Sequence, residues 1–104
     1  IGQCVVVGGG TVLAVEAIDG TDATILRGGK LGRGNAVVVK VCKPRQDIRF
    51  DVPAVGVRTI NTMHKAGATV LAVEAEKAVV FDRDDMIEAA DRFGISIVAL
   101  SKEY

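Results

Sequence analysis

The chain has 104 residues, a formal net charge of zero at pH 7, 49% hydrophobic residues and 25% charged residues. This length is typical of one domain with a modest hydrophobic core. The balanced charge argues against nucleic-acid binding, and so does an aromatic content of three Phe, one Tyr and no Trp, because that binding relies on basic surfaces and stacking platforms. The uncharged apolar runs are too short to cross a bilayer.

In the first half of the chain, the pattern predicts a β-hairpin, a short helix and a third strand. Val-rich runs separated by Gly8, Gly9 and Gly10 are typical of two strands joined by a tight turn. Thr21 or Asp22 is expected to cap a helix that ends by Gly28 and Gly29. The expected strands span residues 3–7, 11–17 and 36–42.

In the second half, two helices and three strands are predicted. Val57, Ile60 and Met63 share one face of a helix over residues 57–66. Strands over residues 69–75 and 77–81 are expected to pair, and Asp82 is expected to cap the last helix. Met86, Ala90 and Phe93 are expected on the buried face of this helix. The final strand is expected over residues 95–100. The fold class is α/β, a single compact domain with a mixed β-sheet of about six strands and three helices.

The heptapeptide TVLAVEA occurs twice, at residues 11–17 and 69–75. One interpretation is convergence on a good buried strand sequence. The other is that Glu16 and Glu74, which end the two copies, mark the place where the sheet meets a cleft.

The two cysteines, Cys4 and Cys42, lie in separate Val-rich runs. The chain has one His and no CxxC motif, so it lacks the four ligands of a structural zinc site. We expect two buried, reduced thiols, as in a cytosolic protein. The one histidine, His64, is expected on the surface of its helix, beside Lys65.

A glycine-rich, basic stretch, GGKLGRGN, covers residues 28–35. Backbone N–H groups in such a stretch can bind phosphate. However, it has neither the GxxxxGK[ST] pattern nor the GxGxxG pattern, and it precedes a strand. Both a flexible connection and a ligand lid remain open.

The stretch KPRQDIRFDVP, residues 43–53, alternates strictly in character. Arg45, Asp47, Arg49 and Asp51 fall on one parity, which in an extended chain places them on one face, roughly 7 Å apart. Guanidinium groups bind phosphate oxygens and carboxylates bind Mg²⁺. The alternation therefore suits a phosphate site, and equally a charged edge strand that deters aggregation.

A second acidic stretch lies at the turn after residues 11–17. It contains Glu16, Asp19 and Asp22, followed by the expected helix. A helix N-terminus attracts anions, but these carboxylates would repel one unless a metal ion intervened. Simple capping of the helix is the alternative.

The order and spacing of these motifs resemble the C-terminal domain of the LpxI-type UDP-2,3-diacylglucosamine pyrophosphatases. The resemblance covers essentially the whole chain, and it is the combination of motifs that makes it specific. The motifs are Ile1-Gly2-Gln3, Val15-Glu16-Ala17, Gly20-Thr21-Asp22, Lys40, Lys43-Pro44, Gln46-Asp47, Arg49-Phe50-Asp51, Pro53, Gly56 and Thr59.

The resemblance implies that residues 1–104 are the C-terminal, catalytic-type domain of a two-domain enzyme, whose N-terminal Rossmann-like domain is absent from this chain. Such enzymes hydrolyse the pyrophosphate bond of UDP-2,3-diacylglucosamine to UMP and lipid X, in lipid A biosynthesis. Water attacks the phosphorus on the UMP side, and a divalent metal, typically Mg²⁺, is the expected cofactor. The chain alone is expected to be inactive.

The resemblance also implies the partners and the location. The expected partners are the nucleotide-activated diacyl amino sugar, the protein's own N-terminal domain and a second copy in a homodimer, without nucleic acid. The expected location is cytoplasmic, peripheral at the inner membrane.

Carried over residue by residue, the resemblance assigns a role to each site residue. Asp51 is the expected essential carboxylate, as a metal ligand or as the base that orients water, and Asp47 is a second catalytic carboxylate. Glu16 and Asp22 are expected to bind the metal with Asp51. The expected phosphate-binding residues are Arg49, Lys43, Gln46 and Thr21. Arg58 is not carried over, because the family varies at its position.

Two other classes of function compete with the enzyme. One is a non-catalytic domain that binds a nucleotide sugar or phosphate, which would keep the cations and tolerate loss of Asp51. The other is a dimerisation module with an exposed charged edge. The combination of Arg49-Phe50-Asp51 with Glu16 and Asp22 favours the enzyme.

Overall fold

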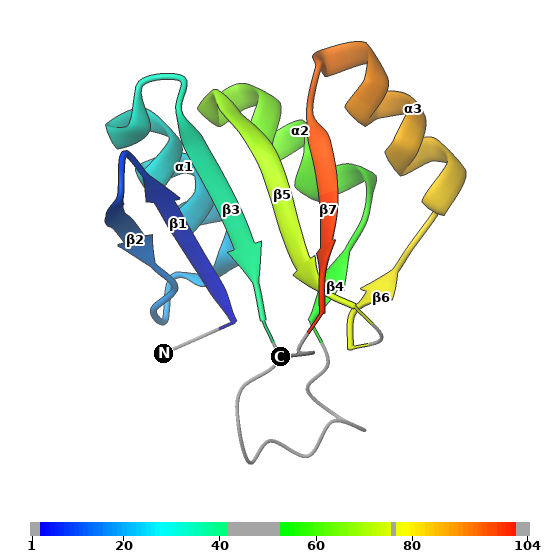
Figure 1. Ribbon diagram of the computed structural model, residues 1–104, viewed down its shortest axis with the longest axis horizontal. Coiled ribbons are helices and arrows are strands. Elements are labelled where there is room, and N and C mark those ends of the chain that lie inside the picture. Colours follow the sequence, from blue (N-terminus) through cyan, green and yellow to red (C-terminus); the bar gives the residue numbers. More distant parts are fainter. Residues whose placement is uncertain (1–2, 42–52, 76, 102–104) are drawn as a thin grey trace.

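Figure 1 shows the computed structural model of the protein, which describes residues 3–41, 53–75 and 77–101. Within these ranges the chain forms seven strands and three helices, which confirms the predicted α/β class. In chain order they are β1 (Cys4–Gly8), β2 (Thr11–Val15), α1 (Gly20–Gly32), β3 (Ala36–Lys40), β4 (Ala54–Val55), α2 (Val57–Ala66), β5 (Ala68–Glu74), β6 (Val79–Val80), α3 (Arg83–Phe93) and β7 (Ser96–Leu100).

The main sheet is mixed, as predicted, with five strands in the order β2-β1-β3-β5-β7. The pairs β3–β5 and β5–β7 are parallel, whereas β1 runs antiparallel to both of its neighbours. The glycine-linked hairpin of β1 and β2 is confirmed. Gly9 and Gly10 at its turn have φ values of 57° and 75°, which glycine adopts without steric cost.

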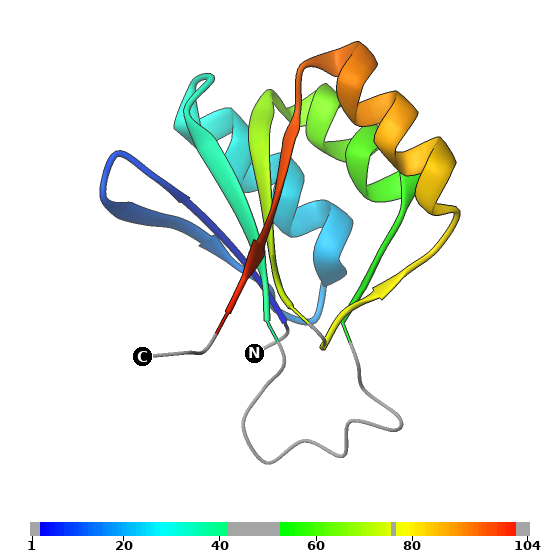
Figure 2. The same ribbon diagram turned by 45° about the vertical axis from the view of Figure 1, so that its right-hand side comes forward.

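The three helices cover one face of the main sheet (Figures 1 and 2). The crossovers β2–α1–β3, β3–α2–β5 and β5–α3–β7 all progress in one direction across the sheet. Right-handed crossovers that progress in one direction place their helices on the same face. The core between the two layers includes Val6, Ile25, Val38, Ile60 and Leu71, all of which are fully buried.

The predicted pairing of residues 69–75 with 77–81 is wrong. The chain does extend at β5 and β6, but β6 pairs with β4, in parallel. Backbone hydrogen bonds extend this two-stranded sheet, from Val79 N–H to Pro53 C=O at 2.9 Å and from Phe81 N–H to Val55 C=O at 2.9 Å. Each short strand follows a main-sheet strand and precedes a helix, so the small sheet lies at one end of the helical layer (Figure 1).

The predicted end of the first helix at Gly28 and Gly29 is also wrong. The helix α1 continues through both residues to Gly32, so most of the glycine-rich stretch is helix, not a loop or a lid. Tertiary packing explains the difference. A Cβ atom on Gly28 would collide with the Val6 side chain, and one on Gly29 would collide with Ala66. These glycines let α1 approach both the sheet and α2 closely.

The two later helices match their predicted positions closely. Helix α2 ends at Gly67 and buries Ile60 and Met63. Helix α3 follows Asp82, but the Asp82 side chain makes no capping hydrogen bond. His64 is exposed, as predicted, and its ring stacks on Phe93 with a centroid distance of 3.9 Å, which joins α2 to α3.

Within the part of the chain that the structure describes, none of the helices combines the length and apolar character that a membrane span requires.

Candidate functional site

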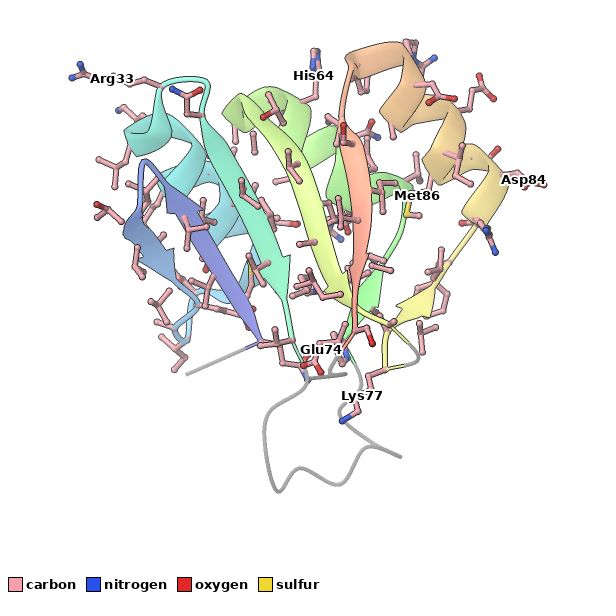
Figure 3. All side chains as sticks on the ribbon, in the orientation of Figure 1. Arg33, His64, Glu74, Lys77, Asp84 and Met86 are labelled. Carbon is pink, nitrogen blue, oxygen red and sulfur yellow. The ribbon has the colours of Figure 1, made fainter. Side chains whose placement is uncertain are left out.

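One edge of the main sheet gathers several of the polar side chains singled out in the sequence. The strands β2, β3, β5 and β7 all end at this edge, and β1 begins there. Glu16 follows β2 directly, Lys40 is the last residue of β3 and Glu74 is the last residue of β5. We call this the carboxyl edge. It is the lower edge in Figure 3, where Glu74 and Lys77 lie, whereas Arg33 and His64 mark the opposite end.

A pocket of about 470 Å³ opens at the carboxyl edge. It is formed by the start of α1, the end of β3, the strand β4 and the start of α2. We call it the polar pocket, and its lining residues are Asp19, Gly20, Thr21, Asp22, Lys40, Ala54, Arg58 and Thr59.

Glu16 and Thr21 are joined across the turn between β2 and α1. The Thr21 hydroxyl donates a hydrogen bond to Glu16 Oε1 at 2.7 Å. The Glu16 backbone N–H donates to the Cys4 carbonyl at 2.9 Å, which fixes the turn to β1. The predicted capping by Thr21 or Asp22 is wrong, because α1 begins at Gly20 and its N-cap is Asp19. Through its hydrogen bond to Oε1, Thr21 instead holds the Glu16 carboxylate at the carboxyl edge.

Asp22 forms an ion pair with Arg58 at the mouth of the pocket. The Arg58 nitrogens Nε and Nη2 lie 2.9 and 2.8 Å from Asp22 Oδ2. The Thr62 hydroxyl adds a longer hydrogen bond of 3.4 Å to Asp22 Oδ1. Because the Arg58 side chain is largely exposed, the pair contributes little to stability. Its effect is local, since it places a guanidinium group beside the starts of both helices.

Lys40 is the charged side chain deepest in the pocket, with 6% of its surface exposed. Its ammonium group donates a hydrogen bond to the Ala54 carbonyl at 2.9 Å, which ties β3 to β4. An ammonium group has three N–H donors. Burial of a charge is costly unless polar groups surround it. Because the Ala54 carbonyl occupies one of the three donors, we expect the others to bind an anion that enters the pocket.

The sequence analysis did not assign Lys40 or Arg58 to the site. The local sequence indicates burial for Lys40 but gives no indication for Arg58. Lys40 shares the parity of Ala36 and Val38, which places it on the helix-covered face of β3. The alternation of the strand therefore indicates that Lys40 is buried. The pairing of Arg58 with Asp22 joins residues far apart in the chain, so no local pattern indicates it.

Cys4 lies behind this cluster, fully buried and reduced. Burial raises the pKa of its thiol to about 11, and the negative charges of Glu16 and Asp22 act in the same direction, against the opposing effect of Lys40. The thiol is therefore neutral near pH 7 and is not a nucleophile there. The prediction of a buried thiol holds for Cys4, and Cys42 lies outside the described residues.

The polar pocket has the elements of an anion site. The N-termini of α1 and α2 both border it, and helix N-termini carry partial positive charge and unpaired N–H groups. Lys40 and Arg58 add cationic donors, and Thr21 adds a hydroxyl. The carboxylates of Glu16 and Asp22 lie at the same corner, next to groups suited to phosphate oxygens. This mixture suits a phosphate ligand accompanied by a cation.

Five of the predicted site residues, Lys43, Gln46, Asp47, Arg49 and Asp51, lie outside the described residues. The residues on either side of that segment are described, and both lie at the carboxyl edge. Val41 donates its backbone N–H to the Gln3 carbonyl at 2.9 Å, and Pro53 precedes Ala54 of the polar pocket. The predicted Glu16, Thr21 and Asp22 lie together at the same edge as Val41 and Pro53.

Within the described ranges, no three His, Cys, Asp or Glu side chains lie together in a group that could hold a metal ion. Besides Asp19, which pairs with Arg27, the described part of the site supplies two carboxylates, Glu16 and Asp22. Both are oxygen donors of the kind that Mg²⁺ prefers, and each already accepts a hydrogen bond from a neighbour. One or two carboxylates are the number that Mg²⁺ commonly takes from a protein when substrate phosphates supply further ligands.

Sequence comparison relates this architecture to known proteins. The family described as the LpxI C-terminal domain matches residues 1–98. The chain belongs to the LpxI family. This C-terminal domain is also 39% identical over 111 aligned residues to the UDP-2,3-diacylglucosamine pyrophosphatase LpxI of Caulobacter vibrioides. The alignment covers 99% of the chain and 40% of the length of that relative, so the LpxI domain described above corresponds to less than half of it.

Proposed function

We propose that this LpxI C-terminal domain supplies the phosphate-binding half of an active site that hydrolyses UDP-2,3-diacylglucosamine to UMP and 2,3-diacylglucosamine 1-phosphate. The observation that carries the proposal is the polar pocket, where two helix N-termini and the buried Lys40 converge beside Glu16 and Asp22. Family membership and a relative named for this pyrophosphatase activity support the choice of substrate.

In the proposed reaction, a water oxygen bonds to the phosphorus on the UMP side. The bond from that phosphorus to the bridging oxygen breaks, and the sugar 1-phosphate leaves. Lys40 and the two helix N-termini stabilise the negative charge that develops on the phosphate oxygens. Thr21 and Arg58 orient the diphosphate at the mouth of the pocket. Asp51 binds the cation or orients the attacking water, and Asp47 assists it.

We also propose Mg²⁺ as the cofactor, held by Glu16, Asp22 and Asp51. When bound, the ion neutralises the charge of the diphosphate and polarises its oxygens. Arg49, Lys43 and Gln46 complete the proposed phosphate contacts. The proposed partners are the N-terminal domain of the same protein and a second copy in a homodimer, and the proposed location is the cytoplasmic side of the inner membrane. The activity belongs to lipid A biosynthesis, where the sugar 1-phosphate product is lipid X.

The test measures UMP release from UDP-2,3-diacylglucosamine by the intact protein, with Mg²⁺ and with EDTA. Asp51→Asn should lower turnover at least about 100-fold, the effect of losing one catalytic group, while substrate binding persists. Asp84→Asn is the matched control, because Asp84 is exposed on α3 and points away from the sheet (Figure 3). EDTA should abolish turnover, and added Mg²⁺ should restore it.

Absence of UMP release by the intact protein would refute the proposed reaction. If the protein binds the substrate without hydrolysing it, the non-catalytic binding domain is correct instead. Equal turnover by Asp51→Asn and the wild type would remove Asp51 from the catalytic machinery.

A further inference from the structure

A second cavity, larger than the polar pocket and lined mainly by apolar residues, lies near it. It has a volume of about 740 Å³ and lies between α3 and the helix-facing side of β5 and β7. Val73, Met86 and Ile97 form part of its lining, and Met86 extends from α3 toward the sheet (Figure 3). We call this cavity the apolar groove. The rim residues Val80 and Ile87 are each 40% exposed, so apolar surface there remains in contact with water.

Small side chains explain why the groove exists. Ala75, Ala78, Ala90 and Ala99 line it at positions where larger residues would fill the space between α3 and the sheet. Its charged lining residues are Glu74, Arg83 and Asp91. Glu74 ends β5 and Arg83 begins α3, so two of the three stand at element ends rather than along the apolar walls.

The polar pocket and the apolar groove flank the two-stranded sheet β4–β6. Ala54 of β4 lines the pocket and accepts the hydrogen bond from Lys40, whereas Val80 of β6 lines the groove. In the main sheet, Lys40 is paired with Val73, which also lines the groove. A ligand with a charged head and an apolar tail would therefore find complementary surfaces on neighbouring strands.

We propose that the apolar groove binds a fatty acyl chain of the substrate while the diphosphate occupies the polar pocket. This inference rests on the proposed function, because the relative's substrate, a diacylglucosamine linked to UDP, carries acyl chains beside its diphosphate. A flexible hydrocarbon chain suits an open groove whose walls are mainly aliphatic.

The test uses the intact protein with Ala99→Trp, which fills the groove, and Val98→Trp as the matched control. Ala99 lines the groove, while Val98, its neighbour in β7, is 43% exposed on the opposite face of the sheet. Ala99→Trp should lower kcat/KM for UDP-2,3-diacylglucosamine with long acyl chains at least about tenfold, and should change it little for the diacetyl analogue. Val98→Trp should change neither value substantially.

A second measurement does not depend on turnover. Binding of a fluorescent long-chain fatty acid should weaken at least about tenfold in Ala99→Trp and persist in Val98→Trp. If the intact protein fails to hydrolyse the substrate, the proposed function falls, but this binding difference still decides whether the groove holds an acyl chain. Ile87→Ser, at the exposed rim, replaces Ala99→Trp if that variant does not fold, and should also weaken binding of the probe.

Equal effects of Ala99→Trp and Val98→Trp on probe binding would overturn the inference. So would equal losses of kcat/KM for the long-chain and diacetyl substrates. A change of oligomeric state in Ala99→Trp alone, measured by light scattering, would assign the groove to a second copy of the protein and would also overturn it.

Discussion

Lys40 shows how a single buried charge can define a site. It ends an otherwise aliphatic strand and has 6% of its surface exposed, so its ammonium group needs polar partners. The Ala54 carbonyl is one such partner. Because the ammonium group also borders the polar pocket, it can serve both to connect β3 with β4 and to bind an anion.

Lys40→Met should lower the affinity of the intact protein for UMP and lower kcat/KM, each at least about tenfold, because a hydrogen bond to a charged group contributes about 1.5–3 kcal/mol. Calorimetric titration with UMP measures the affinity. Lys65→Met is the control, since Lys65 is exposed on α2 and does not line the polar pocket. Unchanged UMP affinity combined with a lower unfolding temperature would show that Lys40 has a structural role only.

The ion pair of Asp22 with Arg58 shows the limit of sequence reasoning at this scale. Asp22 was predicted at the site because of the family resemblance. Arg58 was set aside, yet it lines the same pocket. Only the packing of α1 against α2 brings the two side chains within 2.8 Å of each other.

At the scale of elements, the repeated heptapeptide TVLAVEA is instructive. Its first copy forms the edge strand β2, where most residues are exposed, and its second forms the central strand β5, where most are buried. The interpretation of the repeat as a good buried strand sequence therefore holds for β5 but not for β2, which buries only Ala14. Glu16 and Glu74 nevertheless lie at the same edge of the sheet, because β2 and β5 run in the same direction.

The glycines of α1 make a second point at this scale. In isolation, Gly28 and Gly29 indicate the end of a helix, because glycine lowers helix stability by about 1 kcal/mol each relative to alanine. In the fold they permit contact with Val6 and Ala66 that any side chain would block. Tertiary packing thus offsets the local preference.

Gly28→Ala should therefore destabilise the protein by about 1–3 kcal/mol through overpacking, despite the better helix propensity of alanine. Urea unfolding monitored by circular dichroism measures the change. Val6→Ala should reduce the cost of Gly28→Ala in a double-mutant cycle, because it removes the two Cγ atoms among the three Val6 atoms that the new methyl group meets. Lys30→Ala, on the exposed side of the same helix, is the control. A Gly28→Ala protein as stable as the wild type would contradict this account of the packing.

At the scale of the whole molecule, we infer that the polar pocket forms one side of a larger site. The chain corresponds to 40% of the length of its Caulobacter relative, and the pocket opens at an edge of the domain. Catalysis on a diphosphate requires groups that surround it and exclude water. We therefore propose that another part of the protein closes the site.

Residues 1–104 expressed alone should fold but release UMP at less than about 1% of the rate of the intact protein, the scale of losing positioned catalytic groups. Circular dichroism would verify the fold, and a coupled UMP assay would measure the rate. Comparable rates for the isolated domain and the intact protein would show that the domain holds a complete active site.

The sequence by itself determined most of the elements and the family. Hydrophobic periodicity located α2, α3, the β1–β2 hairpin and the central strands, since local spacing dictates which face each element buries. Its motifs also led to the family that the comparison shows. Only the tertiary structure decided the pairing of β4 with β6, the passage of α1 through its glycines, and the meeting of Lys40, Asp22 and Arg58. Each of these depends on contacts between distant segments, which no local pattern contains.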